Sequence, residues 1–180
     1  MTQSRRIVLG VTASIAIHRA LDLCSELRKR NHRVDVVMTP AATRLVAPMT
    51  FQAFSHRKVH HELWEPSDSF DHDHIRLAQD GEILVVVPAT ASSIGKLAQG
   101  IFDNVLLTTA AAFAGPRLFA PAMNWRMWAN PAVQRNVARL QQDGWTMVPP
   151  VDGDLACGEQ GPGRLASVAE ILAALEALLP

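Results

Sequence analysis

Short apolar runs and longer amphipathic stretches alternate along the chain. Five runs have the composition of buried strands: residues 6–11, 33–38, 83–87, 118–120 and 145–148. Other stretches have the apolar spacing of helices that cover a sheet: residues 17–31, 94–99, 104–112, 131–143 and 167–179. Nearly continuous apolar strands are typical of a parallel sheet, because helices cover both of its faces. The pattern predicts an α/β fold with three layers, a doubly wound parallel sheet of the Rossmann or flavodoxin type.

Several stretches between these elements have weaker patterns. Thr39-Pro40 is typical of a helix start, with threonine as the cap and proline at the first helical position. Residues 50–54 and 75–79 predict short helical segments, and residues 59–61 a short strand. Residues 152–164 contain five glycines or prolines, which excludes a helix. A loop of that length without an element of its own is usually a functional flap or disordered, and we interpret this one as a flap.

Length, charge and cysteine content limit the expected functions. A chain of 180 residues suits one domain, here residues 1–180, that buries about 70% of its unfolded surface. Seventeen basic residues balance seventeen acidic ones, so no long-range field favours nucleic acid or an anionic membrane. No apolar segment approaches the roughly 20 residues needed to span a bilayer. With two cysteines and no signal pattern, we expect a cytoplasmic protein that binds a small molecule or a protein.

The stretch PAMNWRMW, residues 121–128, follows a predicted buried strand and carries an amide, two thioethers and two indoles. Parallel sheets bind ligands beyond the carboxyl ends of their strands, so these side chains are candidates for a binding site. The alternative is that the methionines and tryptophans fill the core and that Asn124 caps a helix. This stretch alone does not separate the two interpretations.

Two other strand ends are also rich in small polar residues. Residues 10–14 read GVTAS and lead from the first strand into a helix, whose free backbone N–H groups favour an anion. The segment has neither a Walker lysine nor three spaced glycines. Hydroxyls of Thr12 and Ser14 would suit the phosphate of a mononucleotide such as FMN, although Ser14 is equally explained as a helix cap. Residues 88–93, PATASS, form a hydroxyl-rich exit from the most apolar strand.

The histidines and cysteines do not predict a metal site. His60 and His61 are adjacent, but no cysteine or carboxylate stands at zinc-ligand spacing from them. His72 and His74 would share one face of a strand, yet a turn into a helix is the expected structure there. Cys24 lies on the apolar stripe of the first helix and is interpreted as a core thiol. Cys157 lies in the glycine-rich loop, where core packing does not explain it.

Together these segments resemble the flavin-dependent cysteine decarboxylases over nearly the whole chain. GVTASIA is similar to the family's first phosphate loop, PATASS to its PASANT motif, and PAMNWRMW matches its PxMNxxMW motif in full. His74-Ile75 looks like the catalytic histidine and the isoleucine that follows it. Ala156-Cys157-Gly158 resembles the cysteine flap of the branch that acts on phosphopantothenoylcysteine. Two departures are Ser92, where the motif has Asn, and Asp80-Gly81, where many relatives have Trp-Ala.

The resemblance implies FMN-dependent decarboxylation of 4'-phospho-N-pantothenoylcysteine to 4'-phosphopantetheine in coenzyme A biosynthesis. Oxidation of the carbon that bears sulfur gives a thioaldehyde, which accepts the electrons left when carbon dioxide departs. The resulting enethiol is then reduced. In this reaction His74 would be the acid/base, with His72 as a weaker rival, and Cys157 would protonate the enethiol.

The resemblance also implies which residues form the binding site. Asn124 would hold the substrate carboxylate, and Met127 and Ala156 would line the same pocket. The residues expected to hold FMN are Ala13, Ser14, Ile15, Thr39, Thr90, Ala91, Ser92, Ser93 and Ala122. In this family FMN lies between the subunits of a homotrimer, sometimes built into a homododecamer, and the sequence does not choose between them.

Other functions remain open at this stage. A relative could oxidise the C-terminal cysteine of a peptide and stop at the enethiol, a reaction that does not need Cys157. A prenyltransferase of a related flavin family is less well matched by PAMNWRMW. A non-catalytic, flavin-binding regulatory subunit is a third alternative, against which the retained His74, Asn124 and Cys157 argue. Because residues 1–180 leave no room for a synthetase domain, we expect the condensation of phosphopantothenate with cysteine to occur elsewhere.

Overall fold

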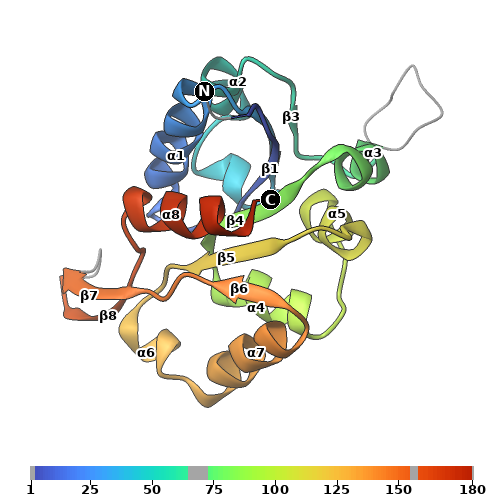
Figure 1. Ribbon diagram of the computed structural model, residues 1–180. Coiled ribbons are helices and arrows are strands. Elements are labelled where there is room, and N and C mark those ends of the chain that lie inside the picture. The colour runs from blue at the N-terminus through green and yellow to red at the C-terminus, as the bar shows by residue number, and fades with distance from the viewer. Residues whose placement is uncertain (1–2, 65–72, 155–157, 180) are drawn as a thin grey trace.

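A computed structural model describes residues 3–64, 73–154 and 158–179 (Figure 1). Its centre is a parallel sheet of six strands in the order β3-β2-β1-β4-β5-β6. The strands are β1 (Arg6–Val11), β2 (Arg33–Met38), β3 (Val59–His60), β4 (Ile83–Ala89), β5 (Arg117–Pro121) and β6 (Trp145–Met147). The chain winds outward from β1 to β3 and then in the opposite direction from β4 to β6. This order confirms the doubly wound α/β fold that the hydrophobic pattern predicted.

Helices cover both faces of the sheet, and successive strand residues alternate between them. On one face Ile83 and Val85 of β4 pack with α1 (Ile17–Lys29), α2 (Pro48–Ser55) and α8 (Val168–Leu178). On the other face Leu84 and Val86 pack with α3 (Asp73–Asp80), α4 (Ala91–Ala98), α5 (Val105–Ala112) and α7 (Pro131–Gln142). All of β4 is therefore buried, as its continuous apolar run indicated.

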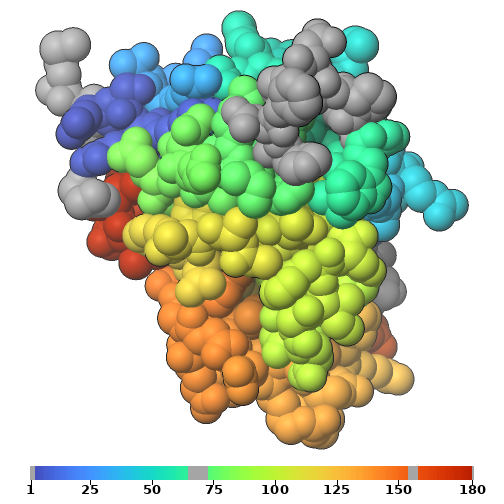
Figure 2. Space-filling view, turned by 90° about the vertical axis from the view of Figure 1, so that its right-hand side faces the viewer, coloured from blue at the N-terminus to red at the C-terminus, as the bar shows by residue number. Residues whose placement is uncertain are grey.

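The second face is visible from outside in Figure 2, where α3 in green and α5 in yellow lie above the orange residues of α7. On the first face Cys24 of α1 is fully buried in the core, and burial raises the pKa of its thiol to about 11. This placement confirms Cys24 as a core thiol. Among the described helices, none is long and apolar enough to cross a lipid bilayer.

Helix bounds differ from the sequence prediction at two strand ends. After Thr39 the chain forms only a 3-10 turn, η1 (Ala42–Arg44), and the next α-helix begins at Pro48. Helix α4 begins at Ala91, three residues before the predicted start, because the Thr90 side chain accepts a hydrogen bond from the Ser93 N–H and caps it. The serines of PATASS therefore belong to the first turn of α4, and not to an exit loop.

The prediction that residues 152–164 form no element of their own was wrong. Strands β7 (Val151–Asp154) and β8 (Gln160–Arg164) pair as an antiparallel hairpin. Backbone hydrogen bonds hold the two strands together. Gly153 and Gly163, one in each strand, have positive φ. The strands of this hairpin have no alternation of apolar and polar side chains, so their sequence does not have the pattern that predicts strands.

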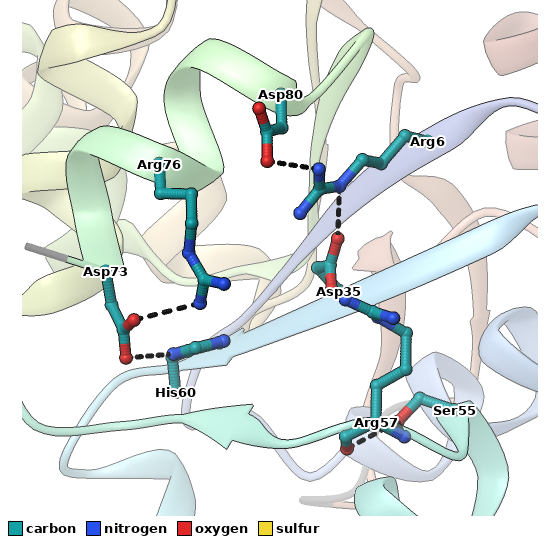
Figure 3. A network of polar contacts seen from close by, with 8 residues as sticks. All are labelled: Arg6, Asp35, Ser55, Arg57, His60, Asp73, Arg76 and Asp80. Carbon is teal, nitrogen blue, oxygen red and sulfur yellow. Dashed lines mark hydrogen bonds and ion pairs between the residues drawn. The ribbon is translucent and has the colours of Figure 1, made fainter. Parts of the chain in front are cut away.

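A polar network ties the first three strands to α3 (Figure 3). The Asp35 carboxylate on β2 is almost fully buried and accepts hydrogen bonds from Arg6, at 2.8 Å, and from Arg57. Arg6 also pairs with Asp80 at the end of α3. Burial alone would raise the pKa of Asp35, but the hydrogen bonds and charges of the two arginines outweigh burial and hold it below its ordinary value.

Asp35→Asn should lower the free energy of unfolding at pH 7 by about 2–3 kcal/mol, because two partly buried guanidiniums lose the charge of Asp35, although Arg6 keeps its pair with Asp80. The measurement is urea denaturation with an unchanged m-value. Asp22→Asn is the control, since Asp22 pairs with Arg19 at the exposed surface, where a pair contributes about 0–1 kcal/mol. Because the folded-state pKa of Asp35 is lowered, its contribution should shrink as pH falls below about 4. Equal costs for the two variants would contradict the role given to Asp35.

Candidate functional site

A pocket of about 700 Å³ opens at the carboxyl edge of the sheet. Its walls come from the loop between β1 and α1, the start of α4, the loop between β5 and the short helix α6 (Trp125–Trp128), and residues 163–168 around the end of β8. Its volume is in the range of pockets that hold a cofactor or a drug-sized ligand, about 300–1,000 Å³. It lies near the reversal of strand order between β1 and β4, where doubly wound sheets bind ligands.

The structure brings many of the predicted site residues to this pocket. They come from the three strand ends that the sequence singled out: Ala13, Ser14, Ile15, Thr90, Ala91, Ala122, Asn124 and Met127. The lining is largely apolar, and Ile15 and Met127 are respectively 67% and 49% exposed. His18, Arg19 and Arg164 also line the pocket, and none of the three was predicted from the sequence.

Other predicted residues lie away from the pocket lining. Thr39 is buried at the end of β2, where its N–H donates to the Val11 carbonyl. Ser92 is exposed on α4, and Ser93 is buried beside Thr90. Three further predicted positions, His72, Ala156 and Cys157, lie outside the described residues. The roles of all these residues stay predictions.

Thr12 and Ser14 have different surroundings although they stand two residues apart. The buried Thr12 hydroxyl donates to the Pro88 carbonyl at 2.6 Å and accepts from the Thr90 N–H at 3.1 Å. The suggestion that Thr12 would hold a phosphate was therefore wrong, because its hydroxyl joins the ends of β1 and β4. Ser14 lines the pocket, and its hydroxyl also accepts from the Ala16 N–H at 3.3 Å. Ser14 is therefore not the cap of α1, whose cap position is Ala16 and has no side-chain hydrogen bond.

Asn124 uses the two ends of its amide differently. The Oδ1 atom accepts from the Arg126 N–H at 2.8 Å and caps α6. The Nδ2 group faces Glu159, which precedes β8, and donates to its Oε2 atom at 3.3 Å. The alternatives of helix cap and binding site are therefore compatible, because the amide carries both an acceptor and donors.

Strand β8 docks closely against the loop that carries Asn124, and Figure 1 places β8 beside α6. The Met123 N–H donates to the Gly163 carbonyl at 3.0 Å. Gly163 has a φ of 136°, and a Cβ atom added to it would lie 2.3 Å from the Met123 carbonyl oxygen. Only glycine permits this approach of two backbones, so the glycine-rich composition of the hairpin has a steric reason.

His74 lies in the first turn of α3, outside the lining of the pocket. Its neighbour Asp73 accepts from His60 Nδ1 at 2.9 Å and from Arg76 at 3.0 Å, as Figure 3 shows. Burial lowers the pKa of His60 despite the adjacent carboxylate, whereas for Asp73 the charges of His60 and Lys58 outweigh burial and lower its pKa. These contacts fix the start of the helix that carries His74. Within the described ranges no three histidines, cysteines or carboxylates gather as metal ligands.

Gly163→Ala should separate β8 from Met123, because the new methyl group meets a backbone oxygen and a strained φ costs about 1–3 kcal/mol. Hydrogen exchange at the Met123 amide should accelerate about tenfold or more relative to wild type. Gly100→Ala is the control: Gly100 also has a positive φ, of 70°, but no atom lies within 4 Å of its added Cβ. Equal protection of the Met123 amide in both variants would show that docking does not depend on Gly163.

Comparisons with known proteins agree on one family. The model of the flavoprotein family matches residues 1–179. The chain is 42% identical over 165 residues to the coenzyme A biosynthesis bifunctional protein CoaBC of Bacillus subtilis, covering 92% of this chain and 41% of that protein. It therefore spans about two fifths of the length of that relative. It is 36% identical over 175 residues to a probable phosphopantothenoylcysteine decarboxylase of Streptococcus mutans, covering 96% of this chain and 98% of the relative.

Solved structures support the same fold. The FMN-dependent cysteine decarboxylase SpaF superposes with a TM-score of 0.82 at 31% identity, covering 95% of this chain and 97% of that one. A PPC decarboxylase mutant complexed with pantothenoylaminoethenethiol superposes with a TM-score of 0.85 at 27% identity, covering 97% and 98% of the two chains. The resemblance seen in the sequence motifs thus extends over the whole fold.

Proposed function

Because the chain belongs to the flavoprotein family, we propose that it is an FMN-dependent decarboxylase that converts 4'-phospho-N-pantothenoylcysteine to 4'-phosphopantetheine in coenzyme A biosynthesis. The observation that carries the proposal is the Asn124 amide, which lines a cofactor-sized pocket within an intact PxMNxxMW motif. The near-complete overlap with the Streptococcus mutans relative supports the same substrate.

The residues of the pocket fit a flavin mononucleotide. The pocket is lined by Ser14, which precedes α1, and by Thr90, the cap of α4, and free N–H groups and the dipole at a helix start favour a phosphate. Ile15, Ala122 and Met127 offer apolar surface to a planar ring. Bound FMN would supply the two-electron oxidation of the substrate carbon that bears sulfur.

The chain's own residues would position the substrate and move protons. The Asn124 Nδ2 group would hold the departing carboxylate, and Met127 would pack beside it. His74 would exchange a proton during oxidation, since an unperturbed histidine pKa of about 6.5 suits proton transfer near neutrality. Cys157 would protonate the enethiol during reduction. This role requires a reduced thiol, and thiols stay reduced in the cytoplasm, the location expected from the sequence.

We also propose that the flavin lies between subunits of a homotrimer or homododecamer. Two observations support this. His74 is outside the lining of the pocket in its own subunit, so a second copy of the chain would have to present this side chain. Ile15 at the mouth of the pocket and Met49 on α2 are apolar and largely exposed, as expected of surfaces that a partner covers.

The proposal predicts yellow protein with an FMN spectrum that releases carbon dioxide from 4'-phosphopantothenoylcysteine. Mass spectrometry should identify 4'-phosphopantetheine as the product, and a peptide ending in cysteine should remain unchanged. The peptide is the discriminating control, because its conversion to an enethiol would support the alternative function. Protein that is colourless and cannot be reconstituted with FMN would refute the cofactor.

Cys157→Ser should still release carbon dioxide but accumulate the enethiol, because only the reduction lacks its proton donor. The readout is the ratio of enethiol to 4'-phosphopantetheine, which does not depend on protein yield. Cys24→Ala is the matched control, since that thiol is buried in the core with a raised pKa of about 11. It should leave the ratio at the wild-type value. Complete turnover by Cys157→Ser would remove Cys157 from the mechanism.

A further inference from the structure

Three side-chain donors converge on the carboxylate of Glu159. The Trp125 indole donates to Oε2 at 2.8 Å, and the Asn124 Nδ2 group donates to the same oxygen at 3.3 Å. The Arg126 guanidinium approaches Oε1 at 3.5 Å. The donors are consecutive residues at the start of α6, and Glu159 stands 35 residues away from Asn124 in sequence.

This cluster has the chemistry of a carboxylate site. An indole N–H and a guanidinium donate hydrogen bonds and accept none, and the only acceptor of the Asn124 side chain already caps α6. The Arg126 guanidinium lies over the Trp125 ring, 5.1 Å from its centroid, which fixes the two donors relative to each other. The cluster therefore favours an anion with two oxygens over a neutral group.

The same Asn124 amide lines the pocket, so Glu159 occupies a donor assigned above to the substrate. We propose that Glu159 is an internal competitor that fills the carboxylate site of the ligand-free protein. Trp125 and Arg126, which adjoin Asn124 outside the pocket lining, then bind the substrate carboxylate together with Asn124 at the edge of the pocket. This inference rests on the proposed function. Two carboxylates cannot share the donors without repulsion, so binding must displace the Glu159 side chain.

The surroundings of Glu159 allow this exchange. Its side chain is 42% exposed, so a change of rotamer moves the carboxylate into water. The hairpin itself is held independently, by the Met123–Gly163 hydrogen bond and by Gly161 against Trp125. The decarboxylated product has no carboxylate, so the three donors can bind the Glu159 carboxylate again. The competitor thus weakens substrate binding but favours product release.

Calorimetric titration of the flavin-loaded protein tests the exchange. The ligand is 4'-phosphopantothenoylserine, whose hydroxyl cannot form a thioaldehyde, and its C-terminal carboxamide is the neutral counterpart. Glu159→Gln should bind the carboxylate ligand roughly five- to tenfold more tightly than wild type, as expected when a charge-assisted competitor is lost. Its affinity for the carboxamide should not change. Arg126→Met should weaken only the carboxylate ligand.

Asp152→Asn on β7 is the matched control, because it removes one negative charge from the same hairpin at an exposed position. It should bind both ligands as wild type does. Unchanged or weaker binding of the carboxylate ligand by Glu159→Gln would overturn the proposal, even if decarboxylation is established.

The indole N–H signal of Trp125, assigned with Trp125→Phe, gives a readout that does not depend on the proposed substrate. Acetate should shift this signal at roughly fivefold lower concentration in Glu159→Gln than in wild type. An equal response would overturn the internal competitor. If neither serine analogue binds while acetate gives the expected difference, the substrate assignment fails and the competitor stands.

Discussion

The hydroxyl of Thr12 makes the contact on which the geometry of the pocket depends. It joins the ends of β1 and β4, the two strands from which the chain winds in opposite directions. The loop that carries Ser14 starts at one of these ends, and the helix that carries Thr90 and Ala91 starts at the other. Because Thr12 is buried and bonded on both sides, these two walls of the pocket are held together as a unit.

The third wall depends on a different kind of contact. The loop after β5 is fixed by the helix cap of Asn124 and by the close backbone approach of Gly163 to Met123. The first contact orients the amide, and the second brings the hairpin over it. A cluster of side-chain donors thus arises where an antiparallel hairpin meets the carboxyl edge of a parallel sheet.

Much of this arrangement was predictable from the sequence, for a physical reason. Buried parallel strands are continuous apolar runs, and their ends meet at one edge, so polar residues at Ser14, Thr90 and Asn124 had to come together.

The pattern could not show that Thr12 points into the fold while Ser14 lines the pocket. Strands β7 and β8 lack apolar alternation, and the contact of Glu159 with Trp125 depends on the hairpin that they form. His74 also lies outside the pocket lining, which local sequence does not reveal.

The two edges of the central sheet are short strands. Strand β3 has two residues and β6 has three, so each edge offers few backbone groups to a neighbouring strand. Natural sheets use such truncated borders to prevent strand-by-strand growth into larger aggregates. Any contact between copies at the central sheet would therefore rely on side chains and not on strand pairing.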